Sequence, residues 1–466
     1  MGIGELRKKA LEIGALLKEW NNIAVIYHYD ADGICAGAIM CSALERAGKK
    51  HNAQWVKQLY SDTIEEIRGL GEKYVFVDFG SGQMELLEKE FGGNFVVVDH
   101  HQKSSEREFE HELNPFDFDV DGGQEISGAG LSYLVSLGLG SGNEILAPLA
   151  IVGAVGDMQD SRGPLQGANR EILESAVGQG LMSVEKDLAL YGRISRPLIQ
   201  FLMFASSPVI PELTANEENC VSFLRGLGIE LKWGDEWRSY SDLDEDEKNV
   251  FRNALVIHMN KHGVQEWKIL SMFGDVYTLL KENEKSPLRD VKEFATLCNS
   301  CGRHAMAEVA LAVCMGDRGE RYEEALGLLA EHRRQLRAGI EFVQKNEIED
   351  RGSFYFFDSG IEIKDSIVGI VAGMLYGGGQ IGGDKPIIAL AESEDGSLKI
   401  SGRGTAELLR KGLNIGGAFN EICTELGEGC AGGGHKIAAG CKIRKECRGR
   451  FLKLLEGVFE RQLRKN

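Results

Sequence analysis

The sequence predicts an α/β protein with a doubly wound parallel sheet, followed by a helical insertion and a second, smaller α/β domain. Continuously apolar segments at 23–27, 74–77 and 95–98 are typical of strands buried on both faces. Segments with helical periodicity separate these strands, which gives the alternation of a βαβ series. Acidic or histidine-bearing turns follow the strands, at the edge where open α/β sheets place their active sites.

The individual elements of the first domain follow from the same patterns. Residues 1–18 predict an amphipathic helix, and residues 33–47 predict a helix that Gly48 ends. The apolar face of the first helix would consist of Leu6, Ala10, Ile13 and Leu17. A buried helix over 147–155 leads into Asp157. We therefore assign residues 1–185 to the first domain.

Residues 186–345 change in character and are expected to be mostly helical, forming a connector between two α/β domains. The segment 231–248 is acidic and contains Trp233 and Trp237. Such a charge run is typical of a solvated loop or helix face, and the alternative is a surface that docks a partner.

Residues 346–466 predict the second α/β domain. Strands are expected at 354–357, 386–390 and 398–401, and helices at 363–375 and 406–413. Glycine clusters at 377–383 and 432–434 separate these elements.

The bulk composition limits the function classes. The 466 residues are 43% hydrophobic and 27% charged, as in soluble globular proteins, and the net charge of −18 argues against a non-specific nucleic-acid coat protein. It leaves a nuclease open, because metal ions and a local basic groove can hold phosphates. No apolar run is long enough to span a membrane, the N-terminal residues lack a signal-peptide layout, and ten cysteines show no disulfide framework. We therefore expect reduced thiols and a cytoplasmic protein without a membrane partner.

Several groups that bind hard divalent cations follow the predicted strands and the helix before Asp157. The first strand ends in His28-Tyr-Asp30-Ala-Asp32, and the next delivers Asp78. Carboxylates suit Mn²⁺ and Mg²⁺, and Mn²⁺ also accepts imidazole. Asp30 and Asp32 would serve one metal each, Asp78 would bridge them, and His28 would add a nitrogen ligand.

The third strand ends in Asp99-His100-His101. We expect His100, together with Asp157, to complete the second metal site. His101 would contact a phosphate oxygen or the leaving group, and Asp99 would orient an imidazole. Two divalent metals about 4 Å apart cleave phosphoesters, with Asp78 next to the attacking water.

The last domain contains groups suited to phosphate. Gly432, Gly433 and Gly434 precede His435, and backbone N–H groups of glycines can converge on an anion. Arg403 can hold a phosphate through two hydrogen bonds. Cys298 and Cys301 form a single CxxC, which needs two more ligands for zinc, and His304 and Cys314 are the nearest in sequence. Otherwise this segment packs a helix, or Arg303 and His304 line the substrate channel.

These motifs together resemble the DHH phosphoesterase superfamily. The four metal-binding segments match its motifs, and Asp99-His100-His101 is the motif that names it. Ala431-Gly-Gly-Gly-His435 resembles the glycine-rich segment of the DHH-associated C-terminal domain, and Ser401-Gly-Arg403 resembles its substrate-binding strand. Ser127-Gly-Ala-Gly130 is similar to the helix start that follows the third motif. The length and the segment 293–303 most resemble the archaeal RecJ-like exonucleases of the GINS-associated nuclease type.

The resemblance implies a hydrolase with two Mn²⁺ or Mg²⁺ ions that trims single-stranded DNA or RNA from an end in replication or repair. It also implies that the GINS complex is a partner, for which 231–248 is the candidate docking segment. Two alternatives stay open. One is an enzyme that cleaves short oligoribonucleotides or cyclic dinucleotides, and the other is a replication scaffold that binds GINS without catalysis.

Overall fold

The computed structural model describes residues 2–103, 107, 109–205, 208–377 and 381–463. Its chain divides into two compact units: Met1–Met203 with Glu217–Leu329, and Phe204–Asn216 with Ala330–Asn466. Met1 and residues 464–466, at the ends of the first and last predicted domains, lie outside the described residues, as do 378–380 within the predicted glycine cluster.

The first unit contains a five-stranded parallel sheet in the order β2-β1-β3-β4-β5. Its strands are β1 (Ile23–His28), β2 (His51–Val56), β3 (Lys73–Val77), β4 (Phe95–Val98) and β5 (Glu112–Leu113). The chain winds to one side of β1 and then to the other, so the sheet is doubly wound as predicted. The strand order reverses between β1 and β3, which is where sheets of this order bind ligands.

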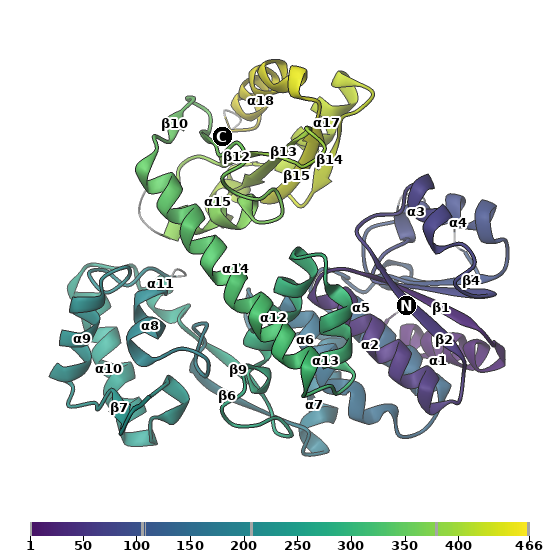
Figure 1. Ribbon diagram of the computed structural model, residues 1–466, viewed down its shortest axis with the longest axis horizontal. Coiled ribbons are helices and arrows are strands. Elements are labelled where there is room, and N and C mark those ends of the chain that lie inside the picture. The colour runs from purple at the N-terminus through teal and green to yellow at the C-terminus, as the bar shows by residue number, and fades with distance from the viewer. Residues whose placement is uncertain (1, 104–106, 108, 206–207, 378–380, 464–466) are drawn as a thin grey trace. The chain divides into compact units, whose positions relative to one another are not determined.

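Helices cover both faces of this sheet (Figure 1). One face, with Ala24, Ile26 and Phe76, packs on α3 (Ser61–Ile67) and α4 (Met84–Phe91). The other face packs on α2 (Ala31–Arg46) and α5 (Gly128–Leu139), and α1 (Ile3–Glu19) and α6 (Ala147–Gly156) share the same core. The four residues predicted for the apolar face of α1 are all buried. Burial on both faces explains why β1, β3 and β4 are continuously apolar.

The rest of the first unit is rich in helices, as expected, and adds short strands that the sequence did not predict. Strand β6 (Met182–Leu188) pairs antiparallel with β9 (Phe273–Leu279), and β7 (Lys232–Trp233) forms a hairpin with β8 (Glu236–Trp237). The strand β6 carries Glu185, Lys186 and Asp187, so its sequence lacks the apolar run of a buried strand. The helices here are α7 (Gly167–Gly178), α8 (Leu198–Met203), α9 (Glu217–Gly226), α10 (Glu245–Lys261), α11 (Glu266–Leu270), α12 (Val291–Arg303) and α13 (Ala307–Cys314).

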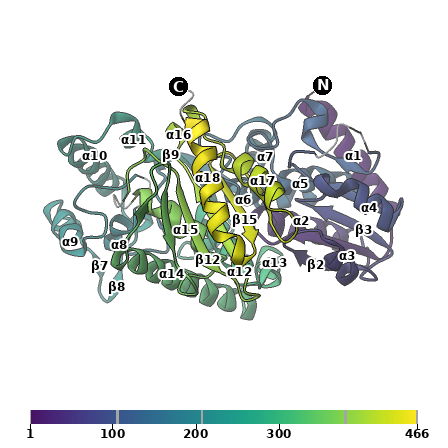
Figure 2. The ribbon, with the colours of Figure 1, turned by 90° about the horizontal axis from the view of Figure 1, so that it is seen from above.

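The long helix α14 (Glu320–Lys345) leads into the second unit, whose mixed sheet has the order β10-β11-β12-β13-β15-β14. Its strands are β10 (Glu349–Asp350), β11 (Tyr355–Asp358), β12 (Ile387–Glu392), β13 (Leu398–Arg403), β14 (Ala431–Gly434) and β15 (Ala438–Ile443). Its helices are α15 (Val368–Gly377), α16 (Ala406–Arg410), α17 (Ile415–Leu426) and α18 (Arg448–Leu463). Helices α17 and α18 pack on one sheet face, as Figure 2 shows, and α15 packs on the other.

Two features of the second unit differ from the sequence prediction. The triplet Gly432–Gly434 lies in the edge strand β14, paired with β15, rather than in a turn. The helix expected over 363–375 begins only at Val368, and the one expected over 406–413 ends at Arg410. Helix ends depend on local capping, which apolar periodicity does not reveal.

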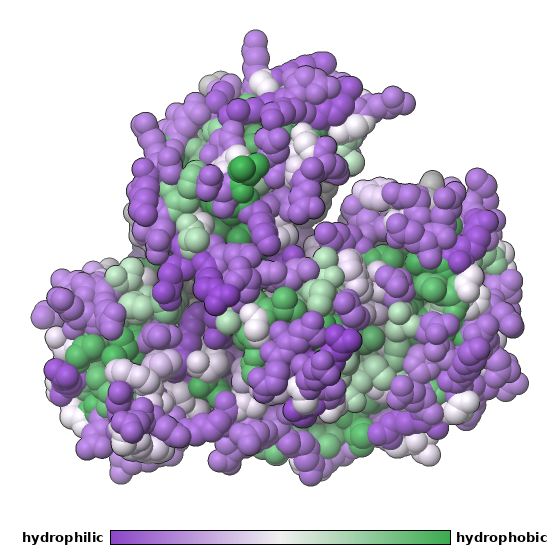
Figure 3. Space-filling model, in the orientation of Figure 1, coloured by the Kyte–Doolittle hydropathy of each residue, from purple (hydrophilic) through white to green (hydrophobic). Residues whose placement is uncertain are grey.

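The face of the molecule in Figure 3 is mostly hydrophilic, with small hydrophobic areas between charged side chains. Among the helices of the described residues, none combines the length and apolarity needed to cross a membrane.

Candidate metal centre

The turn between β1 and α2 places two carboxylates at the carboxyl end of the central strand. Asp30 is the N-cap of α2 and accepts a hydrogen bond from the Gly33 N–H at 3.0 Å. Asp32 lies in the first turn of the helix, and its side chain is fully buried. An acidic residue is favoured at a helix N-terminus, both as a cap and by the helix dipole. The turn therefore fixes both side chains before any ligand binds.

The side chain of Asp32 is held by a second helix. Its two oxygens accept hydrogen bonds from the backbone N–H groups of Gly128 (2.6 Å) and Ala129 (3.0 Å), at the N-terminus of α5. Gly153 of α6 also approaches Asp32 closely, because a Cβ there would overlap with the Asp32 carboxylate. The buried charge thus faces two donors and one end of a helix dipole.

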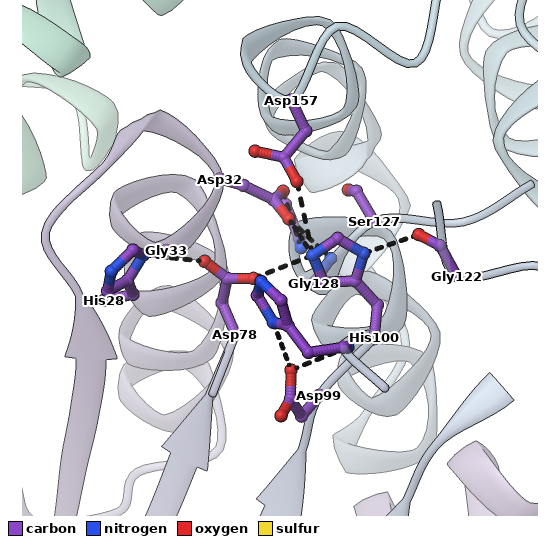
Figure 4. Close-up of polar contacts among 12 residues, drawn as sticks. His28, Asp32, Gly33, Asp78, Asp99, His100, Gly122, Ser127, Gly128 and Asp157 are labelled. Carbon is purple, nitrogen blue, oxygen red and sulfur yellow. Dashed lines mark hydrogen bonds and ion pairs between the residues drawn. The ribbon is translucent and has the colours of Figure 1, made fainter. Parts of the chain in front are cut away.

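Asp78 follows β3 and lies between two imidazoles (Figure 4). Its Oδ2 is 3.4 Å from Nδ1 of His28, and its Oδ1 is 3.2 Å from Nε2 of His100. The residue has φ 66°, a left-handed conformation that Asp and Asn adopt more readily than other non-glycine residues. Gly128 leaves room for it, since a Cβ at that position would lie 2.7 Å from Cβ of Asp78. Each oxygen of one carboxylate is therefore directed to a different histidine.

His28 and His100 complete two groups of potential metal ligands. Nδ1 of His28 lies 2.9 Å from Oδ2 of Asp30, so His28, Asp30 and Asp78 form one group. Nε2 of His100 lies 3.3 Å from Oδ2 of Asp157, which caps the C-terminus of α6, and 3.6 Å from Oδ2 of Asp32. Asp32, His100 and Asp157 form the second group. All six residues predicted as metal ligands are thus brought together.

A backbone carbonyl group orients the ring of His100. Its Nδ1 lies 2.6 Å from the carbonyl oxygen of Gly122, which also accepts a hydrogen bond from Gln159 Nε2. A carbonyl partner requires a proton on Nδ1, and this leaves Nε2 as the atom that faces the carboxylates. This arrangement of a backbone acceptor behind the ring is common for histidines that bind metals.

His101 forms a hydrogen-bonded pair with Asp99 and also belongs to a third potential ligand group, with Asp78 and His100. The buried Asp99 accepts hydrogen bonds from Nδ1 of His101 (2.8 Å) and from the backbone N–H of Ser81 (2.9 Å). The side chain of His101 is 47% exposed. Burial raises the pKa of Asp99, but the histidines and Ser81 outweigh it and hold the pKa below its usual range. Burial lowers the pKa of His101, and Asp99 outweighs it, so that the pKa rises to about 9.

The electrostatics of the cluster fit divalent cations. Burial, Asp78 and Asp157 raise the pKa of Asp32 well above its usual value. Burial lowers the pKa of His28 and His100, but the surrounding carboxylates raise it by more. Both Asp78 oxygens, Nδ1 of His28 and Nε2 of His100 are buried without a hydrogen bond that meets normal geometry. Buried polar atoms without partners that converge on one region, with an excess of carboxylates, are what a cation site requires.

Three family models match the chain. They are the N-terminal domain of the DHH family at residues 22–154, the DHH-CID domain at 190–273 and the DHHA1 domain at 353–461. The chain belongs to the DHH family. Members of this family are phosphoesterases. The predicted metal ligands from His28 to His100, and His101, lie within the matched DHH domain. Asp157 lies just after it.

Individual relatives extend over the whole chain. An uncharacterized protein of Methanocaldococcus jannaschii is 29% identical over 458 residues, which cover 97% of this chain and 96% of the relative. RecJ from Thermus thermophilus in complex with Mn²⁺ is 17% identical, with a TM-score of 0.60. The match covers 98% of this chain and 55% of the RecJ chain. CDC45 from Entamoeba histolytica is 14% identical with a TM-score of 0.64, covering 98% of this chain and 97% of the other. The two structures share the fold of this DHH protein.

The predicted phosphate-binding residues of the DHHA1 domain lie on one end of its sheet. Ser401 and Arg403 are on β13 and face α15, where a Cβ on Gly369 would lie 3.0 Å from Oγ of Ser401 and 2.7 Å from Nη2 of Arg403. His435 follows the edge strand β14 and is exposed. Arg303 belongs to the first unit, where it ends α12.

Sequence reasoning missed the backbone groups that hold the ligands. The carbonyl of Gly122 behind His100, and the N–H groups of Gly128 and Ala129 behind Asp32, come from segments far away in the chain. The only available signal was the small-residue motif from Ser127 to Gly130, in which Ser127 caps α5 by accepting from the Gly130 N–H. Glycine is needed there because Asp78 packs directly against the helix start.

Proposed function

We propose that this DHH protein is a metal-dependent exonuclease that hydrolyses phosphodiester bonds of single-stranded DNA or RNA from an end, in replication or repair. The single observation that carries the proposal is the position of Asp78, one carboxylate directed to the histidines of two separate ligand groups. A carboxylate between two ligand groups is suited to bridge two cations, and paired cations are the catalytic device of many nucleases.

The proposal assigns each ligand group one cation, with Mn²⁺ preferred because imidazoles and carboxylates are combined. His28, Asp30 and Asp78 would hold one ion, and Asp32, His100 and Asp157 would hold the other, with Asp78 shared. When bound, such a pair supplies a strong nucleophile at neutral pH and stabilises charge on the reacting phosphate.

The remaining residues act on the substrate and on protons. His101 is exposed and donates from Nδ1 to Asp99, so its Nε2 would be the atom that contacts a phosphate oxygen or the leaving group. With its pKa raised to about 9, the imidazole is protonated at neutral pH and can donate. Asp99 is a positioning residue, because it holds His101 through a hydrogen bond.

The DHHA1 domain would bind the substrate. Arg403 would hold a phosphate through its guanidinium, with Ser401 beside it on the same strand. Gly432, Gly433 and Gly434 form an edge strand, so their outward N–H groups and the exposed His435 can face a nucleic-acid backbone. Arg303 would add a contact from the first unit. In this proposal residues 1–185 are the catalytic part, residues 186–345 are the connector and residues 346–466 are the substrate-binding part.

The decisive experiment is digestion of single-stranded DNA and RNA 20-mers, labelled at the 5′ or 3′ end, with and without Mn²⁺. The test variant is Asp78→Asn beside Asp78→Ala, because Asn tolerates the left-handed backbone and removes only the charge. Asp119→Asn is a matched control, since Asp119 is exposed, also has positive φ (58°), and lies outside the cluster.

We expect mononucleotides to be released from one end by the wild type and by Asp119→Asn, with no release by Asp78→Asn or after chelation. The labelled end that shortens gives the polarity, and the two substrates give the sugar preference. Intact 20-mers in every reaction would refute the exonuclease. Cleavage of dinucleotides or cyclic dinucleotides under the same conditions would then support the small-nucleotide alternative.

The second candidate is a replication scaffold that binds GINS, and the likeness to the CDC45 fold favours keeping it. Trp233 and Trp237 on the β7–β8 hairpin are 54% and 50% exposed, as expected for a docking segment. Deleting 231–248 would also remove the buried Arg238 and Tyr240, so Trp233→Ala with Trp237→Ala is the cleaner variant. Unchanged GINS pull-down with this double variant would reject the hairpin as the docking segment.

A further inference from the structure

Three cysteine thiols from three helices meet in the core of the first unit, and none of them belongs to the carboxylate groups. Cys35 comes from α2, Cys298 from α12 and Cys314 from the C-terminus of α13. Their Sγ atoms all lie within 4.8 Å of one another. Cys35 and Cys298 are fully buried, and Cys314 is 9% exposed. We propose that these three cysteines form a binding site for a thiophilic cation, with Zn²⁺ as the ion that fits their spacing.

The spacing of the sulfur atoms supports zinc. Sγ of Cys298 lies 3.7 Å from Sγ of Cys314. A zinc–sulfur bond is about 2.3 Å long, so two thiolates on one tetrahedral zinc lie about 3.8 Å apart. The pair is therefore already at the separation that a shared zinc imposes, without movement of α12 or α13.

The protonation of the cluster also suits a cation. Hydrogen bonds from Cys298 and Cys35 lower the pKa of the Cys314 thiol to about 5, although burial opposes this. Burial, followed by Cys298 and Cys314, raises the pKa of Cys35. The Cys314 sulfur is thus the acceptor of the cluster, and the thiols of Cys298 and Cys35 donate to it. Binding of Zn²⁺ would release the thiol protons of the cluster to solvent and form three Zn–S bonds without any redox change.

The thiol group contains only one of the two cysteines of the CxxC motif. Cys301 is buried on the same helix as Cys298 but does not belong to the group, and neither does His304. The third ligand is Cys35, which is more than 260 positions away in the chain. Among the described residues, no further Cys, His, Asp or Glu joins the three thiols. A non-protein ligand would therefore fill the fourth tetrahedral position, on the side of Cys314, which is the most exposed of the three.

The position of the site explains what it would do. Helix α12 packs against the turn that carries Asp30 and Asp32: Oδ1 of Asn299 accepts a hydrogen bond from the Ala31 N–H at 3.0 Å. Gly302 packs so closely on this turn that a Cβ there would overlap with the carbonyl oxygen of Tyr29. A cation held by Cys35, Cys298 and Cys314 would fix α12 and α13 to α2 and so stabilise this turn.

Cobalt substitution tests the proposal in the reduced, full-length protein. Co²⁺ with thiolate ligands gives sulfur-to-cobalt charge-transfer absorption in the near ultraviolet, whereas Co²⁺ on carboxylates and imidazoles does not. We expect this absorption to reach a plateau in the wild type as Co²⁺ is added and to disappear when Zn²⁺ is added in excess. Cys35→Ala, Cys298→Ala and Cys314→Ala should lose it. Cys41→Ala and Cys301→Ala, which are also buried cysteines on α2 and α12, should retain it.

X-ray absorption of the zinc-loaded wild type gives a second measurement that does not depend on any variant folding. Three sulfur neighbours at about 2.3 Å would support the site. A shell of only nitrogen and oxygen, or absence of the charge-transfer absorption in the wild type, would overturn it and show that the thiols only pack the core. Neither result depends on nuclease activity, so the outcome is independent of the proposed function.

Discussion

Replacing Gly153 by alanine should impair the metal centre although it replaces no metal ligand. Gly153 lies in α6, and a Cβ there would lie 2.5 Å from Cβ of Ala129 and still closer to Oδ1 of Asp32. Both neighbours are fixed, because Asp32 accepts hydrogen bonds from the N-terminus of α5 and Ala129 belongs to that helix. The added methyl group must therefore displace the carboxylate, the helix α5, or both.

The magnitudes follow from the two effects of the methyl group. Alanine is favoured over glycine within a helix by about 1 kcal/mol, whereas forcing an extra methyl group into a packed core costs about 1–3 kcal/mol. The free energy of unfolding should thus fall by about 0–2 kcal/mol. Disturbed support of a metal ligand typically reduces metal affinity by about 10–100-fold, and a displacement of about 1 Å reduces turnover by about 100-fold. Function should therefore fall far more than stability.

Calorimetric titration with Mn²⁺ and thermal unfolding of the metal-free protein measure the two effects separately. Gly327→Ala is the matched control: it also lies within a helix, α14, and a Cβ there meets nothing within 4 Å. We expect this control to bind Mn²⁺ normally and to gain slightly in stability. Wild-type Mn²⁺ affinity and activity in Gly153→Ala would refute the reasoning, since Asp32 would then tolerate the methyl group.

Three further predictions concern stability, metal binding and proton transfer. Asp187→Asn should cost about 3–5 kcal/mol at pH 7, because it removes the closer of the two carboxylates that pair with the buried Arg193 and leaves only Glu185, at 3.6 Å. Burial raises the pKa of Asp187, but Tyr240 and Arg193 outweigh it and lower the pKa. In urea unfolding, the stability difference between wild type and variant should therefore narrow below about pH 4, where the unfolded chain begins to take up the proton, and should vanish once the pH falls through the lowered pKa of the folded state. Mn²⁺ should raise the melting temperature of the protein, because it binds the folded state. In calorimetry, Mn²⁺ should bind more weakly at pH 6 than at pH 8, because the pKa of Asp32 is raised and protons compete with the metal. His101→Gln should lower turnover by about 10²–10⁴-fold in single-turnover assays with unchanged Mn²⁺ affinity.

The central sheet was predictable where its strands are buried on both faces. β1, β3 and β4 are continuously apolar, and burial on both faces is the reason. β2 escaped prediction because it is an edge strand whose residues 52–54 are exposed, so its sequence needs no apolar run. β6 and β9 pair over about 90 positions of sequence, and no local pattern records a partner at that distance.

The candidate site was predictable to the extent that its ligands follow strand ends. Asp30, Asp78 and His100 come after β1, β3 and β4, which are adjacent and parallel, so their carboxyl ends meet. The groups that aim these ligands were not predictable from the residues alone. A carbonyl or an N–H group is present at every position apart from the missing N–H of proline, so residue type gives no sign that Gly122 or Gly128 contributes one.

The conformation of Asp78 connects the fold to the proposed chemistry. A left-handed backbone is unfavourable for a residue with a Cβ, and glycine would relieve that cost immediately after β3. Glycine would also remove a carboxylate that faces both His28 and His100. Strained residues persist where the surroundings hold them in place, and here the start of α5 packs against the side chain through Gly128. The strain, the buried oxygens that make no hydrogen bond and the close glycine all concern the same carboxylate, which is why Asp78→Asn, with the backbone preserved, is the most informative substitution in this protein.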